Sequence, residues 1–114
     1  MKRPAVSSQI KRGSAELAVL AVLADGPLHG YAIAKRIRTD SGGAVSFDVA
    51  ALYPILYAME GRGWVQAAWE QAPNGRRRRA YRLTIQGRGA LQPLRREWRE
   101  FFRALNRLAR FSDA

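Results

Sequence analysis

The sequence predicts an α+β fold that is mostly helical, with three short helices, a β-hairpin and one long C-terminal helix. Apolar residues recur at a helical spacing in the first 60 residues and again after residue 84. Between these two regions the apolar period shortens to two, which is typical of a half-buried strand. The length of 114 residues and the hydrophobic content of 47% favour one folded domain.

The chain is strongly basic, and this narrows what it can bind. It has 20 lysine and arginine residues against 9 aspartate and glutamate residues, for a formal charge of +11. A polyanion relieves such self-repulsion, nucleic acid being the commonest and an anionic membrane surface the second. Only three of these cations are lysines, and the planar fork of arginine suits phosphate groups and guanine edges. The charge therefore favours a nucleic-acid partner.

Several classes of function are disfavoured. The absence of cysteine excludes disulfides and thiolate metal sites, and it favours a reducing, cytoplasmic location. We expect neither a metal nor a cofactor, because the single histidine, His29, has no second ligand beside it. His29 is expected to have a structural role where the second helix begins. The apolar run at residues 15–24 is too short to span a bilayer, and no carboxylate pair suits acid–base catalysis.

The first helix is expected over residues 15–24. Ser14 would cap it, Glu16 would lie near the positive end of its dipole, and Gly26 followed by Pro27 would end it. Apolar residues lie almost all round this helix, so we expect it to be packed between its own domain and a further element.

The second helix is expected over residues 29–38, with residues 39–43 ending it. Ile33, Ala34 and Ile37 would form its buried face. Residues 45–47 are expected to form a short strand.

The third helix has the clearest pattern, from about Asp48 to the glycines of residues 61–63. Its buried stripe follows the spacing i, i+3, i+4, i+7 and consists of Leu52, Ile55, Leu56 and Met59. Tyr53 and Tyr57 are four residues apart and lie away from this stripe.

A hairpin is expected to follow the third helix. Its first strand alternates Val65, Ala67 and Trp69 with other residues, and its turn occupies residues 72–75. Four consecutive arginines, at residues 76–79, would make the tip of the hairpin basic. The second strand, residues 80–84, would bury Tyr81 and Leu83.

Thr84 is expected to cap a last helix that runs to about Arg110. The spacing of its apolar seam is that of a heptad repeat, which indicates lengthwise packing on another helix. The seam consists of Leu91, Leu94, Trp98, Phe101, Leu105 and Leu108. Pro93 should kink this helix or divide it in two.

Together these elements describe a winged helix-turn-helix. We expect residues 1–84 to form a DNA-binding domain with an N-terminal helix, and residues 85–114 to form a dimerisation helix. The arginine tip would lie along the DNA backbone or in the minor groove, although a solvated turn is the alternative. Tyr53 and Tyr57 would face the major groove, unless one of them packs on the hairpin. The four arginines of the tip are Arg76, Arg77, Arg78 and Arg79. Phosphate contacts are also expected from Lys11, Arg12 and Arg36, for which the alternative is ordinary surface charge.

Short motifs along nearly the whole chain carry a resemblance to a known family. They are Leu28-His29-Gly30-Tyr31, Leu52-Tyr53-Pro54 with Met59-Glu60 and Gly63, Gly75-Arg76-Arg77, and Tyr81-Arg82-Leu83-Thr84 with Gly87. In this order and spacing they resemble the PadR family of bacterial and archaeal regulators. The resemblance implies a winged-helix dimer built through the first and last helices, which represses nearby promoters. The single terminal helix is similar to the short branch of the family, whose members sense drugs.

The same resemblance implies a ligand site. Trp98 lies eleven residues after Gly87, where relatives of the short branch have a tryptophan that stacks on a planar aromatic compound at the dimer interface. A contact in the dimer core is the alternative role for Trp98. The implied walls of the site are Leu17, Ala21, Phe101 and Phe102. The chain departs from the family at Ala50 and Ala51, where a hydroxyl residue usually precedes the Leu-Tyr-Pro motif, and at Pro93.

The sequence therefore favours a dimeric, sequence-specific regulator that binds a palindrome in double-stranded DNA, and the resemblance to the family implies that planar aromatic compounds can release it. The alternative is a non-specific nucleic-acid-binding or architectural protein, against which the helix-turn-helix pattern argues. A membrane-surface role for the arginine-rich last helix is a third class, but its heptad seam favours a partner helix.

Overall fold

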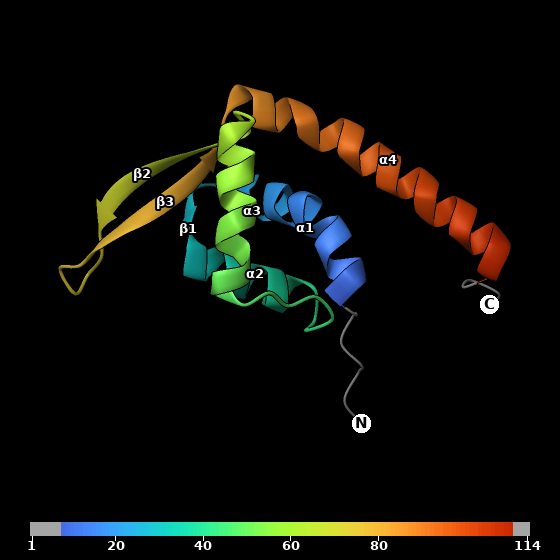
Figure 1. The fold of residues 1–114 in the computed structure, drawn as a ribbon, viewed down its shortest axis with the longest axis horizontal. Coiled ribbons are helices and arrows are strands. Elements are labelled where there is room, and N and C mark those ends of the chain that lie inside the picture. The colour runs from blue at the N-terminus through green and yellow to red at the C-terminus, as the bar shows by residue number, and fades with distance from the viewer. Residues whose placement is uncertain (1–7, 111–114) are drawn as a thin grey trace.

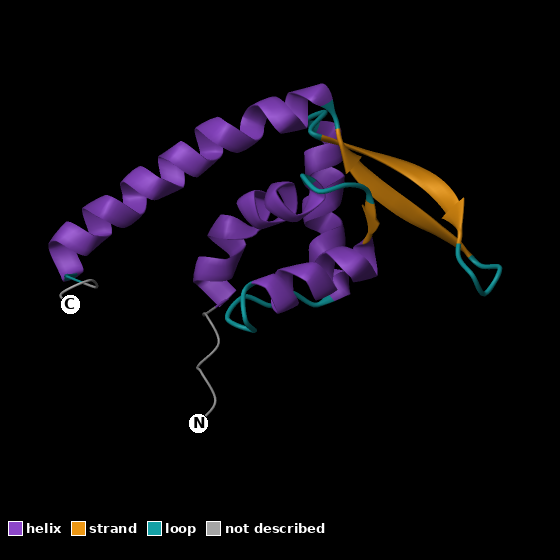
Figure 2. Cartoon of the chain, turned by 180° about the vertical axis from the view of Figure 1, so that it is seen from behind, coloured by secondary structure: helices purple, strands orange, loops and turns teal. Residues whose placement is uncertain are grey.

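The computed structural model describes the backbone of residues 8–110 and the side chains of residues 14–110. Its elements, in order, are α1 (Ser8–Leu23), β1 (Leu28–His29), α2 (Gly30–Asp40), α3 (Val49–Gly61), β2 (Val65–Gln71), β3 (Arg77–Leu83) and α4 (Ile85–Ala109). The strands form one antiparallel sheet in the order β1-β3-β2. Helices α1 to α3 form the body of the molecule, while the β2–β3 hairpin and α4 extend from it in opposite directions (Figures 1 and 2). The predicted fold class, a winged helix-turn-helix with a long last helix, is confirmed.

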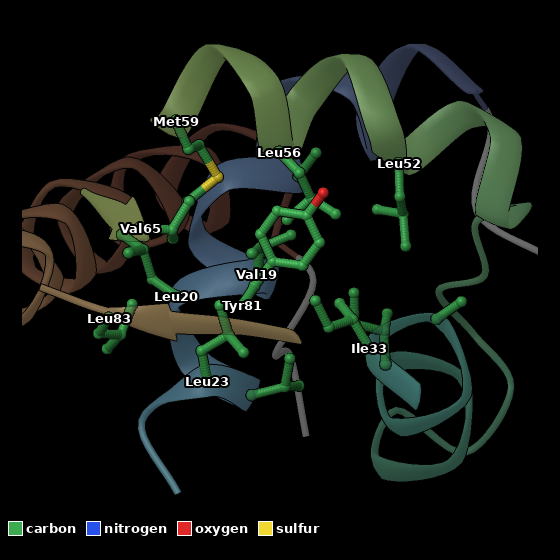
Figure 3. Packing of buried hydrophobic residues seen from close by; sticks show 14 of the residues in the cluster. Val19, Leu20, Leu23, Ile33, Leu52, Leu56, Met59, Val65, Tyr81 and Leu83 are labelled. Carbon is green, nitrogen blue, oxygen red and sulfur yellow. The ribbon is translucent and has the colours of Figure 1, made fainter. Parts of the chain in front are cut away.

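The core lies where α3 packs across α1 and β3 (Figure 3). Leu52, Leu56 and Met59, three residues of the predicted stripe, are completely buried, whereas Ile55 is half-buried. They face the buried residues of the neighbouring elements, which are Val19, Leu20, Leu23, Ile33, Val65 and Tyr81. Each such side chain contributes about 1.5–3 kcal/mol when it leaves water, so this stripe holds α3 in one rotational orientation.

Helix α1 begins earlier than the sequence predicts. It starts at Ser8, so Ser14 lies inside the helix and cannot be its cap, and Lys11 and Arg12 are helical residues rather than a preceding segment. The residues before Ser14 are good helix formers apart from Gly13, whose cost of about 1 kcal/mol does not stop the helix. Glu16 is consequently far from the positive end, and it forms an ion pair with Arg62 at the end of α3.

The strand expected at residues 45–47 is absent. The edge of β3 is instead occupied by the two residues of β1, which place Leu28 opposite Tyr81 and His29 opposite Ala80. The segment at 45–47 is an irregular loop, in which the Ser41 hydroxyl accepts the Val45 N–H and lies 3.0 Å from the Val45 carbonyl oxygen. A strand of two residues is too short to produce a periodic pattern, which is why the sequence did not reveal β1.

The hairpin is longer than predicted. Strand β3 starts at Arg77, so three of the four arginines are strand residues, and only Arg76 belongs to the turn. Tyr81 and Leu83 are buried, as predicted. Trp69 follows the predicted alternation but is 59% exposed, because the outer part of the hairpin projects beyond the core (Figure 1).

Helix α4 begins as predicted and does not divide. The Thr84 hydroxyl oxygen accepts the N–H of Gly87 at 3.0 Å, which caps the helix. The helix continues through Pro93 to Ala109, so the expected division is wrong. Pro93 lies on the exposed side, where water can satisfy the carbonyl that loses its partner. Among residues 8–110, no helix has the length and apolar character that a bilayer span requires.

Two glycines of α4 give a matched test of this packing. A Cβ at Gly87 would lie 2.0 Å from the backbone oxygen of Trp64, whereas a Cβ at Gly89 meets nothing within 4 Å. We expect Gly87→Ala to lower the free energy of unfolding by about 1–3 kcal/mol, because backbone must move. Gly89→Ala should instead raise it by about 0.5–1 kcal/mol through helix propensity. Urea unfolding of both variants measures this difference, and equal effects would contradict the packing described.

Candidate nucleic-acid interface

The hairpin, α3 and the start of α2 enclose one groove, with a volume of about 560 Å³. Figure 1 shows the hairpin standing out beside α3, and residues of both elements line the groove. The residues that line it are His29, Gly30, Tyr31, Tyr53, Tyr57, Trp69, Ala72, Asn74, Arg76, Arg77, Arg78 and Arg79. The structure thus brings together the two tyrosines and the four arginines that the sequence singled out.

The two tyrosines form the wall of the groove on α3. Their rings are stacked, with centroids 6.0 Å apart and planes inclined by 26°. Tyr53 is half-buried against α2, and Tyr57 is 53% exposed. A Cβ at Gly30 would lie 3.1 Å from the Tyr53 hydroxyl oxygen, so glycine at this position gives the Tyr53 ring its place.

The four arginines divide into two pairs. Arg78 binds Glu70 across the hairpin at 2.9 Å, and Arg79 binds Glu60 of α3 at 3.1 Å. Arg77 lies over the Trp69 ring, 5.0 Å from its centroid. Within the described part of the chain, neither Arg76 nor Arg77 has a carboxylate partner. Two guanidinium groups are therefore available to an anion, while the other two hold the hairpin in position.

The exposed side of α3 carries no charge along its first two and a half turns. Its exposed residues are Ala50, Ala51, Pro54, Tyr57 and Ala58. Small apolar side chains allow a close approach to base edges and suit contact with the thymine methyl group. The hairpin supplies the positive charge of this surface, and α3 supplies its uncharged part.

His29 has the structural role that the sequence predicts. Its Nδ1 accepts the N–H of Ala32 at 3.3 Å and caps α2, and its ring stacks on Tyr31 at 6.5 Å. Burial lowers the pKa of His29, and the positive charge of Arg78 lowers it further. The neutral ring is the form that can accept the capping hydrogen bond.

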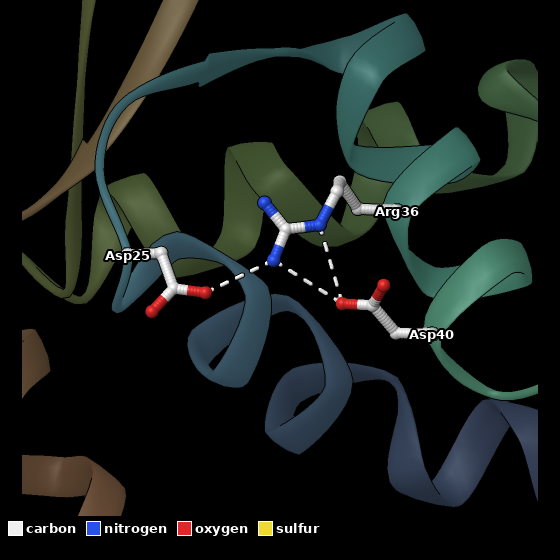
Figure 4. A network of polar contacts seen from close by, with 3 residues as sticks. All are labelled: Asp25, Arg36 and Asp40. Carbon is white, nitrogen blue, oxygen red and sulfur yellow. Dashed lines mark hydrogen bonds and ion pairs between the residues drawn. The ribbon is translucent and has the colours of Figure 1, made fainter.

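Arg36, another predicted DNA contact, does not line this groove. Arg36 is held between two carboxylates, with Asp25 at 2.9 Å and Asp40 at 3.2 Å (Figure 4). The hydrogen bond to Asp25, followed by that to Asp40, raises the pKa of Arg36. The side chains of Lys11 and Arg12 fall outside the residues whose side chains the structure describes.

A second groove, of about 430 Å³, lies between α1 and α4, where the sequence implied a ligand site. Its lining residues are Leu17, Arg95, Trp98, Arg99, Phe102, Arg103 and Asn106. The ring centroids of Phe101 and Trp98 are 5.7 Å apart, but Phe101 does not line the groove. Ala21 does not line it either. Outside the groove, the seam begins with Leu91, which is 7% exposed, and ends with Leu108, which is 82% exposed.

Sequence reasoning missed several residues of both grooves. Tyr31, Trp69 and Asn74 line the first groove. The only sign of this in the sequence was that they lie a few positions from His29 or from the run of arginines. Arg95, Arg99 and Arg103 line the second, and their spacing of four residues would have placed them on one face of the helix. Among residues 14–110, no group of three histidine or carboxylate side chains could hold a metal ion.

Comparisons with known proteins agree with this geometry. Residues 19–93 match the model of the transcriptional regulator PadR-like family. A transcriptional regulator from Clostridium thermocellum has a similar structure, with 25% identity, a TM-score of 0.80 and coverage of 90% of this chain and 96% of that chain. A PadR family regulator from Eggerthella lenta has 25% identity, a TM-score of 0.76 and coverage of 91% and 88%. An uncharacterized protein from Lysinibacillus sphaericus is 27% identical over 83% of this chain and 87% of its own length. The family and both structural relatives are regulators, which fits a chain that is not an enzyme.

The cap made by His29 predicts a pH dependence of stability. Because the folded state lowers the pKa of His29, the unfolded state binds more protons, and the contribution of this residue is complete above the unfolded value of 6.5. The contribution is lost as the pH falls through the lowered value. His29→Asn retains a capping side chain without titrating. We expect unfolding free energy to fall more steeply on acidification in the wild type than in this variant; parallel curves from about pH 7.5 to pH 5 would contradict the assignment.

Proposed function

The chain belongs to the PadR-like family of transcriptional regulators, and from this membership we propose that it is a homodimeric repressor that binds a palindromic operator in double-stranded DNA. In this proposal residues 1–84 are the DNA-binding region and residues 85–114 the dimerisation region, whose helix is α4 (Ile85–Ala109). Planar aromatic compounds release it from DNA.

One observation supports the sequence-specific part of this proposal above all others. Tyr57, on the uncharged exposed side of α3, and the two unpaired arginines of the hairpin line the same groove. In a winged helix-turn-helix, α3 would enter the major groove while Arg76 and Arg77 contact the adjacent backbone or minor groove. The ion pair between Arg79 and Glu60 supports this arrangement, because it ties the hairpin to the end of α3.

The exposed part of the α4 seam supports dimerisation. Phe101 is 51% exposed, Phe102 is 58% exposed and Leu108 is 82% exposed, which leaves the apolar side of this helix half open to water. A second α4, together with α1, would cover it along the heptad spacing. A symmetric dimer would place two copies of α3 on half-sites about 34–36 Å apart, or a multiple of that distance.

The groove beside Trp98 supports release by a ligand. It lies on the apolar seam, and Trp98 and Phe102 offer two rings 5.8 Å apart for stacking. A compound that binds there would contact the same helices that set the distance between the two copies of α3, so it could change that distance.

The first test concerns the hairpin. DNA selected from a random pool by the protein supplies a duplex to compare with its scrambled sequence. We expect Arg76→Gln and Arg77→Gln each to weaken binding to both duplexes and to reduce the slope of log K against log salt by about 0.9 for each phosphate that is no longer neutralised. Lys35→Gln, an exposed change on α2, is the control for the removal of one charge. Equal affinity of the wild type for selected and scrambled DNA would overturn the sequence-specific proposal.

The second test concerns Trp98. We expect a planar aromatic dye to quench tryptophan fluorescence and to release the selected duplex. Trp98→Ala should weaken both responses, whereas Trp69→Phe, in the hairpin, should keep the release of DNA. Loss of the stacking contribution of about 0.5–1.5 kcal/mol lowers the affinity for the dye about two- to tenfold, and loss of the buried area lowers it further. A Trp98→Ala protein that responds like the wild type would refute the stacking role.

A further inference from the structure

Helix α4 carries six arginines, and all of them are exposed. At roughly 100° per residue they fall within an arc of about 120°. We call this surface the arginine face of α4, and it consists of Arg88, Arg95, Arg96, Arg99, Arg103 and Arg107. Arg95, Arg99 and Arg103 also line the groove beside Trp98, but Arg88, Arg96 and Arg107 belong to neither of the two grooves.

The charge of the arginine face is poorly compensated. The helix holds only two carboxylates, Glu97 and Glu100, and both lie outside the arc. Glu100 binds Arg103 at 2.9 Å, and the other five arginines have no carboxylate partner in the part of the chain that the structure describes. Arg95, Arg99, Arg103 and Arg107 follow one another at intervals of four residues, a spacing at which like charges destabilise a helix.

The arginine face leads away from the tip of the hairpin. The hairpin and the C-terminal end of α4 point to opposite ends of the longest axis of the molecule, which measures 52 Å (Figures 1 and 2). The face is also distinct from the seam, because the apolar residues from Leu91 to Leu108 occupy a neighbouring arc of about 100° that does not overlap with it. A second helix packed on the seam therefore leaves Arg88, Arg96 and Arg107 at the surface, whereas Arg95, Arg99 and Arg103 lie where the arc borders the groove beside Trp98.

We propose that the arginine face of α4 is a second DNA-binding surface, which holds the phosphate backbone of duplex DNA without regard to sequence. This inference rests on the proposed function and adds a second contact to it. From Arg88 to Arg107 the face is about 29 Å long at 1.5 Å per residue. A duplex of that length presents about 17 phosphate charges, so six guanidinium groups meet an ample number of partners. Arginine binds phosphate through a planar fork, which a surface that needs only solubility does not require.

Duplex DNA fits this helix better than a lipid surface does. A helix that lies in a membrane interface inserts its apolar side. Here the first half of that side packs into its own domain, since Leu91 is 7% exposed and Leu94 is half-buried. The arginines, in contrast, are exposed along the whole helix. A rigid polyanion can reach all of them at once, whereas a lipid surface can receive only the outer half of the apolar side.

The experiment measures the salt dependence of binding to a duplex of scrambled sequence, where base readout contributes nothing. Two double variants of the full-length chain, Arg88→Gln/Arg99→Gln and Arg96→Gln/Arg107→Gln, each remove two charges from the face. Lys35→Gln/Arg82→Gln removes two exposed charges elsewhere and is the matched control. Glutamine has nearly the helix propensity of arginine, so α4 should persist in both variants, and thermal unfolding and mass in solution verify that it does.

We expect each face variant to reduce the slope of log K against log salt by about 1.8 per subunit, and to weaken binding about a hundredfold at 0.1 M salt. The control pair should keep the wild-type slope, and the ratio of affinities for selected and scrambled DNA should not change in any variant. A wild-type slope in both face variants would overturn the inference. The inference would also be overturned if the face variants bound vesicles of anionic phospholipid more weakly than the wild type but bound DNA equally well.

The two proposals fail in different ways. If the proposed function is wrong, the wild-type protein does not distinguish selected from scrambled DNA. If only the second surface is wrong, the wild type still makes that distinction, and the face variants bind scrambled DNA as the wild type does.

Discussion

The packing of α3 on α1 and β3 is the interaction on which the candidate site depends. Leu52, Leu56 and Met59 are completely buried, and they fix which side of α3 turns inward. The opposite side, with Ala51, Pro54 and Tyr57, must then face solvent. A helix rotated by one residue, about 100°, would bury a tyrosine and expose a leucine. The same contacts that stabilise the domain therefore determine which side of α3 faces outward, and this is the side that we propose contacts DNA.

Strand β3 connects that core to the arginines. Tyr81 and Leu83 are buried, and because side chains alternate along a strand, Arg77 and Arg79 extend from the same face of the sheet. The Arg79 guanidinium confirms this, since it lies 5.6 Å from the centre of the Tyr81 ring. Arg78 points to the other face, where it meets Glu70 of the opposite strand. Burial of Tyr81 thus directs two of the four arginines toward α3.

Structural features that depend on local spacing and local chemistry were predictable from the sequence. Features that depend on contacts between distant parts of the chain were not. The stripe of α3, the Thr84 cap and the burial of Tyr81 follow from spacing and local chemistry. The pairing of Leu28 with Tyr81 does not, because it joins residues more than 50 positions apart through two backbone pairs. Trp69 shows the same limit, since alternation identifies one face of a strand but cannot tell where the core beneath it ends. The carboxylates that pair with Arg78 and Arg79 come from β2 and α3, so the run of four arginines did not reveal which of its members are already neutralised.

Helix α4 shows how one helix can carry two surfaces without conflict. Its apolar arc and its arginine arc are adjacent and each covers about a third of the circumference. Packing on the apolar arc brings two copies of the arginine arc together, and their mutual repulsion opposes that association unless anions lie nearby. Phosphate groups would remove this repulsion, so a dimer that forms through the seam should be more stable with DNA on the arginine arcs than without it. The two proposals together therefore imply that association through the seam and occupation of the arginine face favour each other.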